Sequence, residues 1–145
     1  MSKKTDRFFY SIFKRNDGML DSGLMKVKVV FHFNATEEKQ ILAFFEEITN
    51  LFAREKPFLI LYDALEITFD TSLKKLMLRF QAFMMEREEA SSRLIRGCAV
   101  IINNPVVKGI AAPIMFFKPA PYPLKLFGKM EEGEVFLQSC DSISS

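Results

Sequence analysis

Two short runs of the chain, Phe58–Tyr62 and Gly97–Ile102, contain apolar residues and one glycine but no charged residue. Strands covered on both faces have such continuous apolar runs, whereas strands exposed on one face alternate apolar and polar residues. Before, between and after these runs, apolar residues recur every three or four positions, which is typical of amphipathic helices. Strands that alternate with helices predict an α/β fold with a mainly parallel sheet.

The remaining elements follow from periodicity and from helix and turn signals. Lys26–Phe33 alternates and is rich in β-branched and aromatic residues, so it predicts a strand. Phe8–Phe13 could pair with it as an antiparallel edge, with a turn at Asn16-Asp17-Gly18. A further short strand is expected at Leu124–Phe127. We expect helices from residues 34–38 to before Pro57, from about Thr71, from Pro105, and from about Glu131 to Cys140, with Pro113 kinking or ending the third.

The expected architecture is therefore an α/β sandwich of four to five strands and about four helices, with an antiparallel edge on the sheet. The 145 residues fit a single domain over 1–145, with residues 1–7 and 141–145 as flexible ends. The longest uncharged apolar run, Ile110–Phe117, is far shorter than the roughly 20 residues of a membrane span. With only two cysteines and no secretory pattern, we expect a cytoplasmic protein.

Residues that usually carry catalysis are few. His32, the only histidine, lies in an expected strand and is interpreted as a surface or edge residue. Cys98 lies within an apolar run, where a thiol usually serves as a small core residue. There is no phosphate-binding glycine loop and no spacing suited to a metal. The sequence therefore predicts a protein that is not an enzyme and holds no metal or cofactor.

One loop has the features of a site. Residues 64–73 leave the carboxyl end of a buried strand, where open α/β sheets carry their functional loops. Two lysines in the first turn of the following helix oppose the helix dipole and would favour an anion, including a phosphate on a neighbouring hydroxyl. The simpler interpretation is N-capping, with the lysines in water. The loop and anion-binding candidates are Asp63, Asp70, Lys74 and Lys75, and the hydroxyl candidates are Thr71 and Ser72.

The segment 59–72, with the sequence LILYDALEITFDTS, resembles the STAS domain of sulfate transporters and bacterial anti-sigma-factor antagonists. The resemblance continues through the strand Cys98–Ile102 and through Asn104-Pro105-Val106-Val107-Lys108, which is similar to the family's helix opening. It covers about Lys26 to Cys140. The chain also resembles a divergent STAS-like branch that is grouped with lipid-transfer folds. Leu73 and Lys74 stand where the family prefers glycine and leucine.

This resemblance implies a non-catalytic regulatory module that binds a partner protein. In the antagonists a serine or threonine of the corresponding turn is phosphorylated, which controls the partner. Carried over residue by residue, the implied phospho-acceptors are Thr71 and Ser72, following Asp70.

Between Arg93 and Lys129 the chain has no acidic residue. The segment carries six cations together with the apolar run Ile114–Phe117. Such an edge could meet an acidic protein, an anionic ligand or a lipid headgroup, although the apolar residues could equally pack in the core. With a net charge of only +2, we do not expect a nucleic-acid partner.

Two further functions stay open at this point. Sixteen Phe and eight Met residues could line a pocket for an apolar or anionic small molecule at the carboxyl end of the sheet, as in a carrier or sensor. Phe8–Phe13 or Phe116-Phe117 could instead form the interface of a homodimer or larger homo-oligomer.

Overall fold

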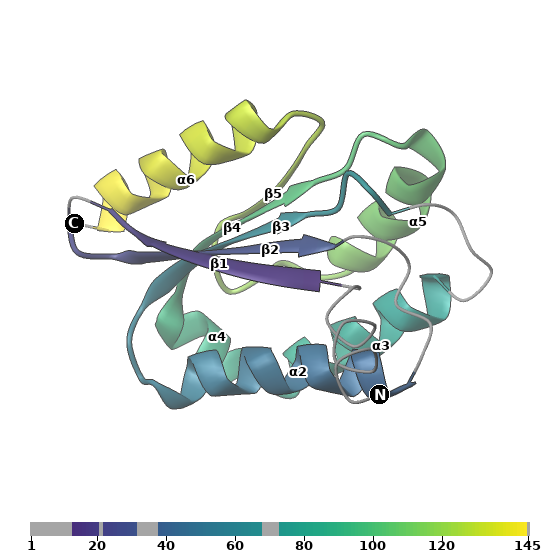
Figure 1. The fold of residues 1–145 in the computed structure, drawn as a ribbon, viewed down its shortest axis with the longest axis horizontal. Coiled ribbons are helices and arrows are strands. Elements are labelled where there is room, and N and C mark those ends of the chain that lie inside the picture. The colour runs from purple at the N-terminus through teal and green to yellow at the C-terminus, as the bar shows by residue number, and fades with distance from the viewer. Residues whose placement is uncertain (1–12, 21, 32–37, 68–72, 145) are drawn as a thin grey trace, which may run out of the picture.

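The computed structural model describes residues 13–20, 22–31, 38–67 and 73–144. Within them, five strands form one sheet in the order β1-β2-β3-β4-β5 (Figure 1). The strands are β1 (Phe13–Met19), β2 (Met25–Phe31), β3 (Phe58–Asp63), β4 (Ile95–Ile101) and β5 (Leu124–Phe127). The described helices are α2 (Glu38–Ala53), α3 (Leu73–Met85), α4 (Glu88–Leu94), α5 (Pro105–Met115) and α6 (Met130–Ser144).

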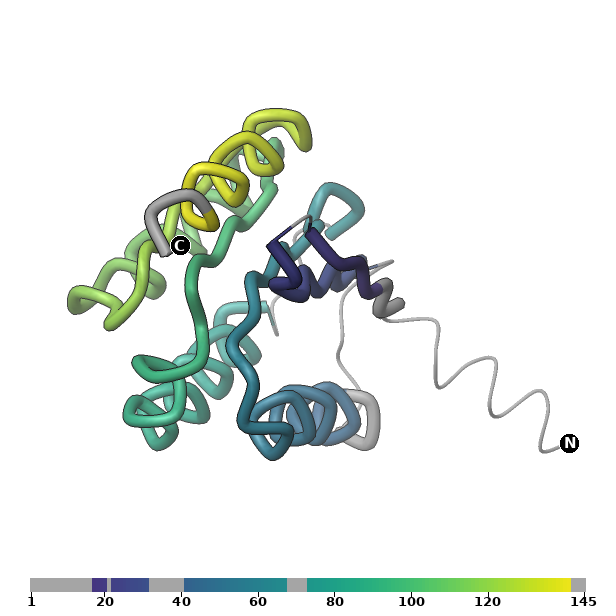
Figure 2. The backbone as a smooth tube through the Cα atoms, turned by 90° about the vertical axis from the view of Figure 1, so that its left-hand side faces the viewer, coloured from purple at the N-terminus to yellow at the C-terminus, as the bar shows by residue number. Residues whose placement is uncertain are grey.

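The helices cover both faces of the sheet. α2, α3 and α4 lie on one side and α6 lies on the other, with α5 near the carboxyl ends of the strands (Figures 1 and 2). β2 to β5 follow one another across the sheet and are parallel. Connections between parallel strands are right-handed. When each new strand is added on the same side of the previous one, all the connecting helices lie on one face of the sheet. α6 follows the last strand, so it is free to cover the opposite face.

The predicted α/β fold is confirmed. β3 pairs in parallel with both β2 and β4, and Phe58 to Tyr62 are all buried, as the apolar run predicts. β1 pairs antiparallel with β2 and forms the expected antiparallel edge. The sequence interpretation missed α4, because the charged residues 86–89 resembled the end of the preceding helix rather than the start of a new one.

The turn predicted at Asn16-Asp17-Gly18 is wrong. These residues lie inside β1, where Asn16 pairs with Lys28 and Gly18 with Lys26. The chain reverses later, between Leu20 and Leu24, where the Leu20 N–H donates to the Leu24 carbonyl at 2.9 Å. Gly23 has a φ of 91°, a left-handed conformation that glycine adopts without strain. Residues 8–12 of the first predicted strand lie outside the described residues.

The two C-terminal helices begin as predicted and end later. The Asn104 side chain accepts hydrogen bonds from the Val106 and Val107 N–H groups, so it caps α5 with Pro105 in the first turn. α5 runs through Pro113 and ends two residues later, at Met115. α6 continues beyond Cys140, and the buried Asp141 carboxylate accepts a hydrogen bond from Ser22 at 2.8 Å. Residues 141–144, predicted as part of a flexible end, are therefore helical.

Candidate functional site

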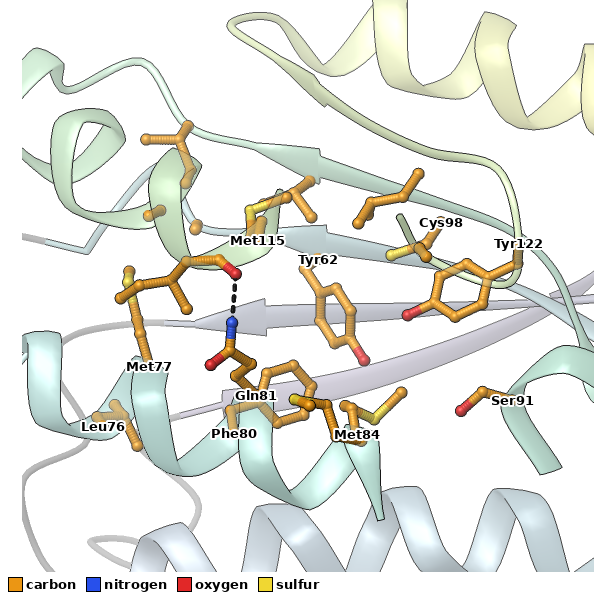
Figure 3. Close-up of a pocket in the computed structure, with 18 of the residues that line it drawn as sticks. Tyr62, Leu76, Met77, Phe80, Gln81, Met84, Ser91, Cys98, Met115 and Tyr122 are labelled. Atoms are coloured by element: carbon orange, nitrogen blue, oxygen red, sulfur yellow. Dashed lines mark hydrogen bonds between the residues drawn. The ribbon is translucent and has the colours of Figure 1, made fainter. Parts of the chain in front are cut away.

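An apolar cavity of about 230 Å³ lies between the sheet and helices α3, α4 and α5 (Figure 3). The sheet contributes side chains that point away from α6, and α3 contributes the side chains opposite them. The loop between α5 and β5 closes one side. Residues from these three parts include Tyr62, Cys98, Val100 and Leu124 of the sheet, Leu76, Met77, Phe80 and Met84 of α3, and Pro119 and Tyr122 of the loop.

Aromatic rings fix one wall of this cavity. The rings of Tyr62 and Phe80 meet edge to face, with centroids 5.8 Å apart and an interplanar angle of 83°. Phe80 also packs against Phe44 of α2, with centroids 5.3 Å apart. Aromatic pairs at these separations hold defined geometries. The wall is therefore built by contacts among the protein's own side chains.

A hydrogen bond sets the distance between two of the helices. The Gln81 side-chain amide of α3 donates to the Ile114 carbonyl of α5 at 2.6 Å, the dashed line in Figure 3. Ile114 lies in the last turn of α5, where backbone carbonyls have no partner within the helix. The Ile114 carbonyl also accepts from the Phe117 N–H at 3.4 Å, so the side-chain bond is an additional contact that links the two helices beside the cavity.

Polar groups gather at one end of the cavity. Ser91 of α4 is 1% exposed, and its hydroxyl has no hydrogen-bond partner. Figure 3 shows the hydroxyl groups of Ser91, Tyr62 and Tyr122 pointing into the space between the sheet and α3. Burial raises the pKa of both tyrosines and of the Cys98 thiol above their ordinary values. All of these groups are therefore uncharged at neutral pH.

Two charged residues stand at the edge of the cavity. Lys118, in the loop after α5, pairs with Glu88 of α4 through a 3.6 Å contact. The two side chains are 48% and 50% exposed. Among the described lining residues, the two charged side chains are thus half-exposed and paired with each other. The side chains inside the cavity are all neutral.

The predicted loop, residues 64–73, contributes apolar side chains to this cavity, but the charged candidates beside it do not. Asp63 Oδ1 accepts a hydrogen bond from the Leu65 N–H at 3.1 Å, which is a local turn contact. Lys74 and Lys75 are exposed in the first turn of α3. None of these three residues lines the cavity, whereas Ile67 and Leu73 do. The predictions for Asp70, Thr71, Ser72 and His32 concern residues outside the part of the chain that the structure describes.

The basic segment divides into paired and exposed parts. Arg93 pairs with Glu55 at 2.7 Å, and Lys118 pairs with Glu88 as described above. Ile114 and Met115 line the cavity, but Phe116 and Phe117 are 50% and 74% exposed. Only part of the apolar run is therefore covered by the fold.

The sequence interpretation missed most of the cavity residues. The apolar stripe of the helix predicted from about Thr71 includes Leu76, Met77, Phe80 and Met84. Its spacing predicts burial, but it does not tell how closely the helix approaches the sheet. Cys98 was correctly predicted as buried, although it also lines the cavity. No sequence signal distinguishes Ser91 from its exposed neighbour Ser92.

Comparisons of this chain with protein-family models, with curated proteins and with solved structures found no match. Across the described residues, no helix is long and apolar enough to cross a membrane. The same residues contain no group of three or more His, Cys, Asp or Glu side chains placed to hold a metal ion.

Proposed function

We propose that this protein binds an apolar small molecule in the cavity between the sheet and α3, and acts as a carrier or sensor of that molecule. The observation that carries the proposal is the cavity of about 230 Å³ with an apolar lining and a cluster of neutral hydroxyls at one end. An engineered apolar cavity of about 150 Å³ admits benzene. The space here is enough for a larger apolar group.

The size of the cavity supports binding over imperfect packing. Voids larger than a water molecule are few in a closely packed protein interior. A space of this size, lined by apolar side chains with a few polar groups and partly open to solvent, is instead typical of a ligand pocket.

A neutral aromatic dye, 1-aminoanthracene, tests the proposal by fluorescence titration. Val100→Phe adds a ring to the floor of the cavity, and Val135→Phe makes the same change on α6 at a side chain that is 71% exposed. We expect wild type and Val135→Phe to bind one equivalent, and Val100→Phe to bind at least tenfold more weakly while keeping its circular dichroism spectrum. A folded Val100→Phe variant that binds like wild type, or a wild type that binds no dye, would overturn the proposal.

We also propose, on the STAS resemblance, that the chain regulates a partner protein through the loop before α3. The observation that favours it is the first turn of α3, which has no acidic residue and carries the exposed Lys74 and Lys75. Affinity capture from the native host would compare wild type with Thr71→Asp and Ser72→Asp, using Ser139→Asp on the exposed side of α6 as the control. Identical partners in all four samples would exclude a phosphorylation-controlled contact.

A further inference from the structure

The hydroxyl of Ser91 is the first indication of what the cavity would hold. It is buried in α4, lines the cavity and has no hydrogen-bond partner. A buried hydroxyl without a partner is unfavourable, because it has lost its hydrogen bonds to water. Its position is therefore suited to a ligand that brings a hydrogen-bonding atom.

Two tyrosine hydroxyls share this end of the cavity. Those of Tyr62 and Tyr122 point into the same space as Ser91 (Figure 3), and no hydrogen bond from either to another described residue is found. Burial raises the pKa of both tyrosines, so both hydroxyls keep their protons and can donate. Three hydroxyl groups from β3, α4 and the loop before β5 thus face one place.

The charges around the cavity indicate the charge of the ligand. Glu88 and Lys118 are the charged residues among the described lining, and they pair with each other in a half-exposed position. A carboxylate or ammonium beside Ser91 would have no buried counter-ion, which makes its transfer from water costly. A neutral head group avoids that cost and still uses the three hydroxyls.

The other end of the cavity is apolar. Ile67, Leu73 and Ala111 line it where the chain leaves β3 and enters α3, and α5 packs alongside. Hydrocarbon is the matching chemistry for such a lining.

Building on the proposed function, we infer that the ligand is an uncharged amphiphile. Its single hydroxyl or carbonyl oxygen is held by Ser91, Tyr62 and Tyr122, and its hydrocarbon part extends along α3 toward Leu73.

Three probes with the same chain and different head groups test this inference: n-decanol, decanoate and decylammonium. Competition with 1-aminoanthracene gives the affinity of each for the full chain. We expect decanol to bind at least tenfold more tightly than either ion. Ser91→Ala and Tyr122→Phe should each weaken decanol binding about threefold to tenfold, whereas Ser92→Ala, an exposed change on the same helix, should leave it unchanged.

Other outcomes overturn the inference in distinguishable ways. If decanoate binds most tightly and Lys118→Met abolishes its binding, the ligand is anionic, and the proposed cavity function stands. If the three probes bind equally and Ser91→Ala has no effect, the hydroxyl cluster is not a head-group site. If no probe displaces the dye from a wild type that binds it, the ligand class is wrong; a wild type that binds neither dye nor probes also overturns the proposed function.

Discussion

The two faces of the sheet are packed in opposite ways. On the α6 face, made by Leu59, Leu61, Gly97, Ala99 and Ile101, small residues let the helix approach closely. A methyl group on Gly97 would lie 2.7 Å from Cys140 Sγ, and one on Gly133 would lie 2.4 Å from Ile101 Cδ1. Contacts this short show that α6 lies against the sheet with no room for a methyl group at these two positions.

The opposite face, called here the cavity face, is made by Phe58, Ile60, Tyr62, Cys98 and Val100. It meets larger side chains, many of them aromatic, and yet it leaves a cavity of about 230 Å³. The same strands β3 and β4 supply both faces through alternate residues. The same two strands therefore pack closely against one helix. The space on the cavity face comes from the way α3, α4 and α5 lie against the side chains opposite them.

The largest effect should come from pH, because three buried acidic groups lie on the cavity side. Burial raises the pKa of Cys98, Tyr62 and Tyr122 above their ordinary values. In the unfolded chain a cysteine loses its proton at about pH 8.5 and a tyrosine at about pH 10. The folded chain keeps all three protons at these pH values. The stability that these three groups contribute is thus full below about pH 8.5 and falls as the pH rises, by about 4 kcal/mol between pH 8 and 10.5. The Cys140 thiol of α6, whose pKa burial also raises, adds to this loss.

Urea unfolding at a series of pH values measures this loss. Cys98→Ala should remove more than half of the part that Cys98, Tyr62 and Tyr122 contribute, because the thiol has the lowest pKa of the three in the unfolded chain. An equal free energy of unfolding at pH 8 and 10.5 in the wild type would show that these groups are not shielded from water in the way the cavity face requires.

The next effect concerns the α6 face. Gly97→Ala should lower the free energy of unfolding by about 2 kcal/mol, because the added methyl group meets both Cys140 Sγ and Cβ, the latter at 2.9 Å. Gly18→Ala is the matched change in a strand, since a methyl group there would have no atom within 4 Å. Thermal unfolding of both variants is sufficient. A Gly97→Ala protein as stable as Gly18→Ala would mean that α6 is loosely held.

The order of the strands and of the helices other than α4 could be predicted from the sequence, and the space between them could not. The apolar runs of β3 and β4 and the cap at Asn104-Pro105 are local patterns with one structural solution each. The turn at residues 16–18 was misplaced because Gly18 lies within a strand, while Gly23 provides the reversal. Local turn signals do not tell which of two nearby glycines the pairing of strands will use.

The candidate site shows the same limit more strongly. Phe80 and Met84 have the spacing of core residues, and they do face the sheet. How α3 is placed beside the cavity depends also on contacts with other elements, such as the bond from Gln81 to Ile114 of α5. Those contacts join residues more than 30 positions apart. The proposed role of the loop at Thr71 and Ser72 stays a prediction.

A smaller effect should appear when the unpartnered hydroxyl is removed from the cavity face. Ser91→Ala should stabilise the ligand-free protein by about 1 kcal/mol more than Ser92→Ala does, because both gain helix propensity but only Ser91 loses an unsatisfied buried group. Differential scanning calorimetry of the two variants, freed of ligand, measures the difference. If Ser91→Ala is the less stable of the two, the hydroxyl already has a partner in the protein.

The smallest predicted effect compares the two faces of the sheet within the single strand β4. Val100→Ile adds a methylene to β4 on the cavity face, three residues from Gly97, and keeps the β-branched shape that strands favour. Because the added group enters open volume, we expect the free energy of unfolding to change by less than about 0.5 kcal/mol, well below the usual cost of overpacking a closely packed core. Thermal unfolding of Val100→Ile beside Gly97→Ala shows whether the two faces differ in free volume or only in the size of their side chains. If both variants lose the same free energy of unfolding, the cavity closes in solution, and a ligand would have to open it.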